Sequence, residues 1–215
     1  TAMVDRLNDS GGVLTEDLRD ALYLWDVSAI LTNNRTMFIS PKLEGLPAAE
    51  GDPAYGVVLP SSPLIFSEEL ASANDDSLLV LQERELLQDR LGSESPARRQ
   101  FARLSTVWIQ NMKIDRARGT AERLFVPRTA VTHQETSADI SGAELTIEDY
   151  RVEMYHVSIR YTSKTEGYLR AAFSWYPDLE VRLDGKPVDN QRSLLGAIIL
   201  PTPAGNHLLE LVPLR

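Results

Sequence analysis

The chain has 215 residues, of which 43% are hydrophobic and 25% are charged, and its formal net charge at pH 7 is −9. This composition is typical of a globular protein with enough apolar residues to form a core. The acidic balance argues against nucleic-acid binding and, more weakly, against docking on anionic lipid. The lack of cysteine excludes thiol catalysis, disulfides and thiolate metal sites.

The length suits one large domain or two small ones. No apolar run reaches the 18 residues that suggest a membrane-spanning helix. The first residues also lack the charged and apolar regions of a signal peptide. We therefore expect either a cytosolic protein or a segment of a longer chain, and composition does not choose between them.

The N-terminal part mixes helical and strand patterns. Thr15 is a good N-cap, and the apolar residues after it recur at helical spacing. Pro96 suits the first position of a later helix, with Ser95 as its cap. The expected elements are a helix over 15–25, a strand over 27–32, a loop over 41–62 with a strand near 56–59, a strand at 64–66, and helices over 83–91 and from 96.

The part after Ser105 has the alternating pattern of short strands. Asp184-Gly185 indicates a tight hairpin. Val152 and Met154 lie out of register with the strand that follows, which suggests a bulge or a twist between the two halves. The expected strands are 107–114, 124–126, 129–131, 145–147, 155–161, 168–175, 179–183, 195–200 and 207–212. The pattern predicts a mostly β chain, with a small α/β region over 1–104 and an antiparallel β-sandwich or jelly roll over 105–215.

The last strands carry an ordered series of short motifs. These are Gly167-Tyr168-Leu169, Ser174-Trp175-Tyr176-Pro177, Val181-Arg182-Leu183-Asp184-Gly185-Lys186-Pro187-Val188, Gly196, Leu200-Pro201, Pro203-Ala204-Gly205-Asn206-His207 and Leu209-Glu210-Leu211. The series resembles the C-terminal extracytoplasmic domain of YfhO-like bacterial multi-pass membrane proteins, which are related to lipid-linked-sugar glycosyltransferases. The likeness is strongest over 150–213. Phe125 to Ala130 and Trp25 to Thr32 resemble shorter family stretches, whereas Asp178-Leu179 stands where the family usually has Gly-Trp.

The resemblance implies a larger protein whose transmembrane helices lie outside this segment. It places the segment at the extracytoplasmic face of the cell membrane and makes the membrane part of the same chain its partner. It suggests membrane glycosyltransfer as the parent protein's activity, with the sugar-transfer carboxylates in membrane-proximal loops elsewhere. The expected form of the sandwich is a galactose-binding-like jelly roll, a fold that holds sugars with aromatic faces and polar edges.

The residues themselves show little catalytic chemistry. The three histidines, His133, His156 and His207, do not lie at metal-ligand spacing. The acidic pairs Glu148-Asp149 and Asp75-Asp76 are interpreted as solvated surface groups, because sequence neighbours on a strand point to opposite faces. No cofactor or metal is expected, and the turn residues Asp184, Lys186 and His207 are expected to serve turn structure.

Three residues are the candidates for ligand contact. A sugar ring presents an apolar face that packs on aromatic rings, and its hydroxyls need polar partners. Tyr176 points away from the predicted core and is the best candidate. Trp175 follows the core-facing alternation, so burial is the favoured interpretation, and His156 lies on the polar face of its strand, so a surface position is favoured there.

We therefore expect a non-catalytic soluble domain that contacts glycan or lipid-linked sugar. The alternative is a scaffold or protein-interaction domain without a ligand of its own, because sandwiches host unrelated functions. A free-standing hydrolase is disfavoured by the lack of paired catalytic motifs.

Overall fold

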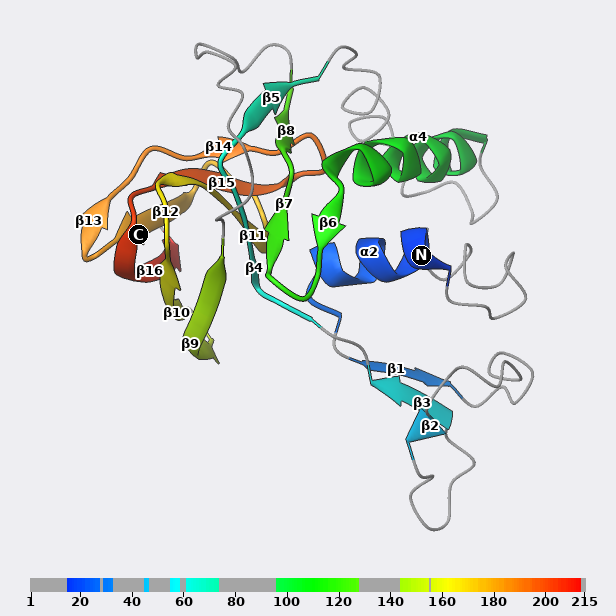
Figure 1. Ribbon diagram of the computed structural model, residues 1–215, viewed down its shortest axis with the longest axis horizontal. Helices are drawn as coiled ribbons and strands as arrows, with labels where there is room; N and C mark the ends of the chain where they lie inside the picture. The colour runs from blue at the N-terminus through cyan, green and yellow to red at the C-terminus, as the bar shows by residue number, and fades with distance from the viewer. Residues whose placement is uncertain are drawn as a thin grey trace. The chain divides into compact units, whose positions relative to one another are not determined.

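The computed structural model describes residues 15–27, 29–32, 45–46, 55–58, 61–73, 96–127, 144–154 and 156–213. The chain divides into two compact units (Figure 1), residues 1–62 with 81–110 and residues 63–80 with 111–215. The predicted helix over 83–91, the strand over 129–131 and the cap at Ser95 lie outside the described residues. In the described part of the chain, no helix has the length and apolar character needed to cross a membrane.

The first unit begins with helix α2 (Glu16–Leu24), as the sequence predicts. The Thr15 hydroxyl accepts a hydrogen bond from the Leu18 amide at 3.3 Å, which satisfies one of the free N–H groups at the helix start. Leu18 and Leu22 are buried at helical spacing. Three described strands of this unit form a small antiparallel sheet in the order β1 (Ala29–Thr32), β3 (Tyr55–Val58), β2 (Gly45–Leu46).

Helix α4 (Pro96–Met112) corrects one prediction, because the extended run expected over 107–114 is helical as far as Met112. Ser105, Ile109 and Met112 are buried at spacings of four and three residues, whereas Val107 is 47% exposed. Over so short a stretch the helical and alternating patterns overlap, which explains the error. Pro96 is the first helical residue, as predicted, and the expected domain boundary at 104/105 falls inside this helix.

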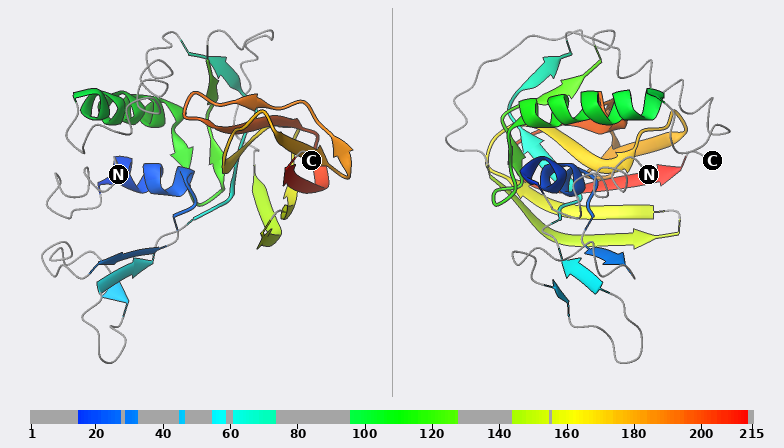
Figure 2. Two further views of the ribbon diagram at one scale, coloured as in Figure 1. Left: turned by 180° about the vertical axis from the view of Figure 1, so that it is seen from behind. Right: turned by 90° about the vertical axis from the view of Figure 1, so that its right-hand side faces the viewer.

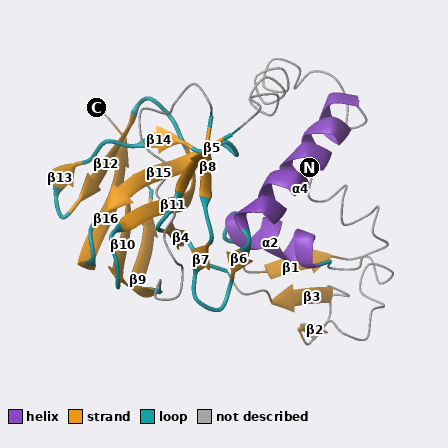
Figure 3. Cartoon of the chain, turned by 45° about the horizontal axis from the view of Figure 1, so that its top comes forward, coloured by secondary structure: helices purple, strands orange, loops and turns teal. Residues whose placement is uncertain are grey.

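The second unit is a β-sandwich (Figure 2, Figure 3). One sheet has the order β13 (Lys186–Pro187), β12 (Leu179–Leu183), β16 (Gly205–Pro213), β10 (His156–Ser163), β9 (Leu145–Glu153). The other has the order β14 (Gln191–Arg192), β15 (Ala197–Thr202), β11 (Gly167–Ser174), β4 (Leu64–Ser67), β7 (Thr120–Ala121), β6 (Ile114–Asp115). The pairs are antiparallel except β4 with β7, which is parallel. A separate parallel pair joins β5 (Leu70–Ser72) and β8 (Leu124–Val126).

The core lies between the two sheets. Its buried members are Leu64, Phe66, Leu145, Ile159, Tyr161, Leu169, Ala171, Val181, Ile198, Leu200, Leu209 and Leu211. They come from β4, β11 and β15 on one side and mainly from β10, β12 and β16 on the other, at every second position along each strand. Strand β4 supplies Leu64 and Phe66, so the sandwich includes a segment that the sequence-based division assigned to the N-terminal region.

The six-stranded sheet is also buried on its other face. Ile65, Arg170 and Ile199 are directly opposite one another on β4, β11 and β15, and each is at most 1% exposed. The near-continuous apolar run of β15 agrees with burial on both faces, whereas the alternation along β11 gave no sign that Arg170 is buried. Burial lowers the pKa of Arg170 to about 9, which leaves the guanidinium charged at pH 7.

Strands β9 and β10 form a tight hairpin, in which Glu153 is opposite His156. The change of register expected after Met154 is therefore a chain reversal and not a bulge. The bulge lies further along, where Arg160 is opposite Asp149 but Tyr161 is opposite Ile147. The hairpin predicted at Asp184-Gly185 is confirmed, because Asp184 (φ 52°) and Gly185 (φ 76°) join β12 to β13 in the left-handed conformation of a type I′ turn.

Candidate functional site

A pocket of about 670 Å³ lies at the end of the sandwich where β11 begins. Its lining comes from four parts of the second unit: Glu68; Thr165, Glu166, Gly167 and Tyr168; Leu183 and Val188; and Pro201, Thr202 and Pro203. The volume is in the range of small-molecule sites. The opening is wide, so the pocket is a shallow depression and not an enclosed cavity.

Gly167 fixes the base of the pocket. A Cβ at this position would lie 2.5 Å from the carbonyl oxygen of Ser67 and 2.7 Å from the Phe66 ring. The neighbouring residue Tyr168 is directly opposite Ser67 on β4 and Pro201 on β15. Glycine thus allows β11 to start close against β4, and this places the Glu68 turn beside the Thr165–Glu166 loop.

The polar groups of the pocket are mostly hydrogen-bond acceptors. The Thr165 hydroxyl donates to the Glu68 carboxylate at 2.6 Å, and Glu166 is exposed. Among the described residues, the pocket lining contains two carboxylates but no lysine, arginine or histidine, and its other side is formed by proline, leucine and valine. Such a surface suits a neutral ligand that donates several hydrogen bonds and has one apolar face. It is unfavourable for phosphate, which is bound by basic groups and backbone amides.

Hydrogen bonds connect the lining residue Thr202 to its neighbour Pro203 and to the core residue Tyr161. The Thr202 hydroxyl lies 3.3 Å from the Pro203 carbonyl, to which it donates, and 2.6 Å from the Tyr161 hydroxyl. Since Thr202 has a single hydroxyl proton, Tyr161 is the donor in the second bond. Burial raises the pKa of Tyr161 well above its usual range, so the phenol stays protonated and neutral.

An aspartate–histidine pair lies next to the pocket. Asp184, which follows the lining residue Leu183, accepts hydrogen bonds from the Leu208 amide at 2.9 Å and from Nδ1 of His207 at 2.8 Å. Partial burial acts to raise the pKa of Asp184, but the hydrogen bonds from His207 and Leu208 outweigh it, so the pKa lies below its ordinary value. The His207 ring is also 5.7 Å from the Tyr161 ring. We expected His207 to bond within its own turn, and the structure pairs it with the β12–β13 hairpin.

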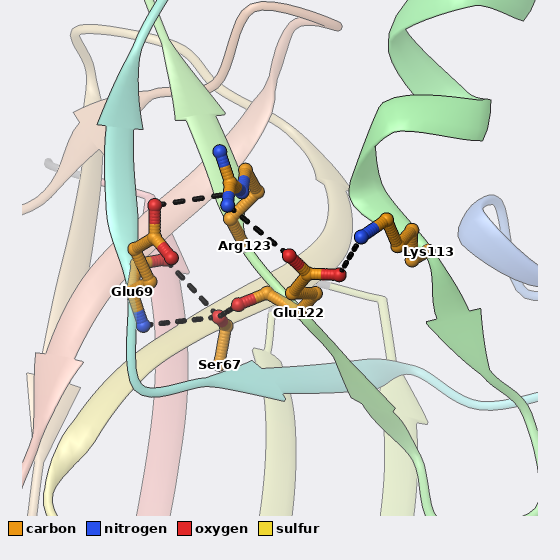
Figure 4. Close-up of polar contacts among 5 residues, drawn as sticks. All are labelled: Ser67, Glu69, Lys113, Glu122 and Arg123. Atoms are coloured by element: carbon orange, nitrogen blue, oxygen red, sulfur yellow. Dashed lines mark hydrogen bonds and ion pairs between the residues drawn. The ribbon is translucent and has the colours of Figure 1, made fainter. Parts of the chain in front are cut away.

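A charged cluster fixes the turn that carries Glu68 (Figure 4). Ser67 Oγ lies 3.1 Å from the Glu69 carbonyl and 3.0 Å from the Glu122 carbonyl, and it accepts from the Glu69 amide. The Nε atom of Arg123 lies 3.4 Å from Oε1 of Glu69, and its Nη2 atom lies 3.1 Å from Oε1 of Glu122. Lys113 also forms an ion pair with Glu122. The hydrogen bond from Lys113 is the main reason that the pKa of Glu122 is lowered. The cluster ties the β4–β5 turn to the β7–β8 segment.

The three residues predicted for ligand contact lie elsewhere. Trp175 is partly buried against the core, and its indole N–H donates to Asn190 at 2.9 Å. Tyr176 is 63% exposed. His156 Nε2 lies 3.1 Å from a Glu210 carboxylate oxygen. Trp175 and Tyr176 follow the far end of β11, an eight-residue strand of roughly 26 Å, so the pocket is at the opposite end.

Sequence reasoning missed the pocket residues Glu68, Thr165, Glu166 and Tyr168. Glu68 comes from the turn after β4, and the other three come from a segment about a hundred residues later in the chain. In the sequence, both segments look like ordinary surface loops. The one available signal was Gly167 at the start of a strand, since an isolated glycine there often marks close backbone approach. That signal indicates the geometry but not the ligand.

Comparisons with known proteins add no assignment, because no protein-family model, no curated protein and no solved structure matches this chain.

Proposed function

We propose that this chain is a non-catalytic extracytoplasmic domain of a bacterial YfhO-like membrane protein, and that its sandwich binds glycan in the pocket at the start of β11. The ordered C-terminal motifs support the family, and through it the location and the membrane partner. The observation that carries the ligand proposal is the pocket lining, with Glu68 and Glu166 beside an apolar wall.

The chemistry of the lining favours the sugar over the other half of a lipid-linked sugar. Carboxylates accept hydrogen bonds from sugar hydroxyls, and proline, leucine, valine and tyrosine side chains suit the apolar face of a sugar ring. A pyrophosphate would meet Glu68 and Glu166, and the described part of the lining has no basic residue to offset their charge. We therefore propose a neutral glycan as the ligand class.

A matched pair of variants tests this proposal. Tyr168→Ala removes an aromatic ring at the pocket end of β11, and Tyr176→Ala removes one just beyond the other end. The purified chain and both variants are screened on a glycan array, and hits are measured by isothermal titration calorimetry. We expect binding by the natural chain and by Tyr176→Ala, and a loss of at least tenfold in affinity for Tyr168→Ala. Thermal unfolding of each variant controls for folding.

Each other outcome points away from the pocket. Loss of binding in Tyr176→Ala alone would move the site to the Trp175–Tyr176 end that the sequence favours. Retention in both variants would place it on another surface. No binding by the natural chain would overturn the ligand proposal and leave a scaffold or protein-interaction role, which the exposed apolar residues along β9 favour.

A further inference from the structure

The aspartate–histidine pair lies where the β12–β13 hairpin meets β16. Leu183 ends β12, Val188 follows β13, and together they form the hairpin wall of the pocket. The Asp184 carboxylate accepts hydrogen bonds from the Leu208 amide at 2.9 Å and from Nδ1 of His207 at 2.8 Å. The Asp184 amide donates to the Leu208 carbonyl at 2.8 Å. Three hydrogen bonds at Asp184 therefore join the turn behind the hairpin wall to β16.

The same histidine contacts a residue that holds the other side of the pocket. His207 on β16 is directly opposite Tyr161 on β10, and the two rings are 5.7 Å apart. The Tyr161 hydroxyl lies 2.6 Å from the hydroxyl of the lining residue Thr202, and both side chains are buried. A continuous series of contacts therefore runs from Asp184 through His207 and Tyr161 to Thr202, and it joins the hairpin wall to the opposite side.

The His207 ring forms this connection through one nitrogen. At pH 7 the Asp184 carboxylate is ionised and only accepts hydrogen bonds, so Nδ1 of His207 carries a proton. The His207 side chain is only 10% exposed, and its Nε2 atom is buried without a hydrogen-bond partner among the described residues. For packing alone an apolar ring would be more favourable, because an unpaired polar atom in the interior is costly. What the imidazole adds at this position is therefore the bond to Asp184.

We propose that Asp184 and His207 are positioning residues of the pocket, which hold the hairpin wall at the separation from Thr202 that ligand binding requires. The effect on a ligand rests on the proposed function, whereas the link between the two sides is a property of the free chain. Within the described part of the chain, the lining includes neither Asp184 nor His207. The pair therefore acts on affinity through the hairpin wall and not by contact with the glycan.

Two substitutions at His207 separate the link from packing. His207→Phe keeps a ring against Tyr161 and removes the donor to Asp184, whereas His207→Asn keeps a side-chain N–H near the place of Nδ1 and removes the ring. Asp184 is half exposed, so water can replace the lost donor and His207→Phe is expected to fold. A histidine that only fills space would make His207→Asn the worse variant in every measurement. Positioning instead predicts opposite orders, with His207→Asn the less stable in urea and His207→Phe the weaker in binding.

Binding and local opening are measured separately at pH 7. Isothermal titration calorimetry uses the tightest-binding neutral glycan from the array screen. We expect His207→Phe to lose at least about tenfold in affinity and His207→Asn less than about threefold. Hydrogen exchange of the ligand-free chain compares the Val188 amide, which donates to Val181, with the core amide of Leu209. The ratio of the two rates should rise about fivefold in His207→Phe and stay within about twofold in His207→Asn.

His156→Phe is the matched control. His156 also pairs with a carboxylate, that of Glu210 at 3.1 Å, but it begins β10, whereas the pocket lies beyond the last residue of that strand. The control is expected to change neither the affinity nor the exchange ratio. The same change in His156→Phe as in His207→Phe would overturn the inference.

The remaining outcomes separate this inference from the proposed function. If the natural chain binds glycan and His207→Phe binds equally well, or His207→Asn binds as weakly as His207→Phe, the inference is overturned and the proposed function stands. If the natural chain binds no glycan, the proposed function fails and hydrogen exchange alone decides. An unchanged ratio in His207→Phe then overturns the link, and an increase that His207→Asn does not share supports it.

Discussion

Substitution of Gly167 by alanine tests how closely β11 and β4 approach at the pocket. The added Cβ would lie 2.5 Å from the Ser67 carbonyl oxygen and 2.7 Å and 3.0 Å from two atoms of the Phe66 ring. Neither neighbour moves easily, because Ser67 belongs to β4 and Phe66 is fully buried in the core. Overpacking of this kind typically lowers the free energy of unfolding by 1–3 kcal/mol, and because two rigid groups clash at one site we expect about 3 kcal/mol for Gly167→Ala. For a chain of this length that corresponds to a melting temperature lower by roughly 6–12 °C.

The measurement is urea unfolding followed by fluorescence, with Gly185→Ala as the control. Gly185 has a φ of +76° and no atom within 4 Å of an added Cβ, so its cost comes from backbone conformation alone, about 1–2 kcal/mol. We expect Gly167→Ala to be the more destabilising of the two. If it costs no more than Gly185→Ala, the two strands are not held as closely as described, and the geometry assigned to the pocket base is wrong.

Three further substitutions test the contacts around the pocket. Tyr161→Phe removes the buried hydroxyl that lies 2.6 Å from Thr202 and should lower the free energy of unfolding by about 1–2 kcal/mol, measured in urea. Asp184→Asn should lower the free energy of unfolding by only about 1 kcal/mol at pH 7, because Asp184 is half exposed and water screens its charge. The pKa of Asp184 is lowered in the folded state, so the carboxylate stabilises the fold above the unfolded pKa of about 4. The difference in stability from the natural chain should therefore shrink as the pH falls below that value. Ser67→Ala should release the Glu69 amide, detectable as faster hydrogen exchange at that position, at a cost of about 1 kcal/mol. An unchanged stability for Tyr161→Phe, a pH-independent difference for Asp184→Asn, or unchanged exchange at Glu69 would contradict the corresponding contact.

Local rules recovered most of the described strands and the first helix. Thr15 caps α2 as expected, and Asp184-Gly185 forms the expected turn, because both features depend on backbone conformations that few residues favour. The rules failed where the decisive information was distant. Helix α4 was mistaken for strand at its C-terminal end, and β4 joined a sheet whose other long strands lie a hundred residues later. Arg170 is 1% exposed although it lies between the core residues Leu169 and Ala171 and so faces away from the sandwich core, and alternation along one strand does not reveal burial on that face.

The candidate site was predictable only in part. The sequence located exposed Tyr176 correctly as a surface aromatic, and it favoured burial for Trp175, which the structure shows as partly buried. The pocket could not be predicted from the sequence, because Glu68 and Glu166 come to line the same pocket only through the pairing of β4 with β11. A carboxylate in a turn looks the same in sequence whether it lines a pocket or faces open solvent.

The motifs that carry the family resemblance mostly explain how the sandwich holds together. Asp184 of the hairpin binds the β16 segment at Leu208 and His207, which joins the Asp-Gly-Lys turn to the turn that precedes the last strand. The Trp175 amide donates to Gly196, and the Pro203 carbonyl accepts from the Ser163 hydroxyl. The Asp184 contacts join segments of the five-stranded sheet and the Trp175 contact joins segments of the six-stranded sheet, and both connect motifs that lie apart along the chain. The motifs therefore contribute to the architecture and also supply part of the pocket lining. On the proposal that the pocket binds glycan, we expect the two carboxylates outside the motifs, Glu68 and Glu166, to contribute to specificity. If the pocket binds glycan as proposed, exchange of these two carboxylates for amides should alter which glycan binds while leaving the free energy of unfolding nearly unchanged. Calorimetric titration together with urea unfolding of Glu68→Gln and Glu166→Gln would separate the two effects.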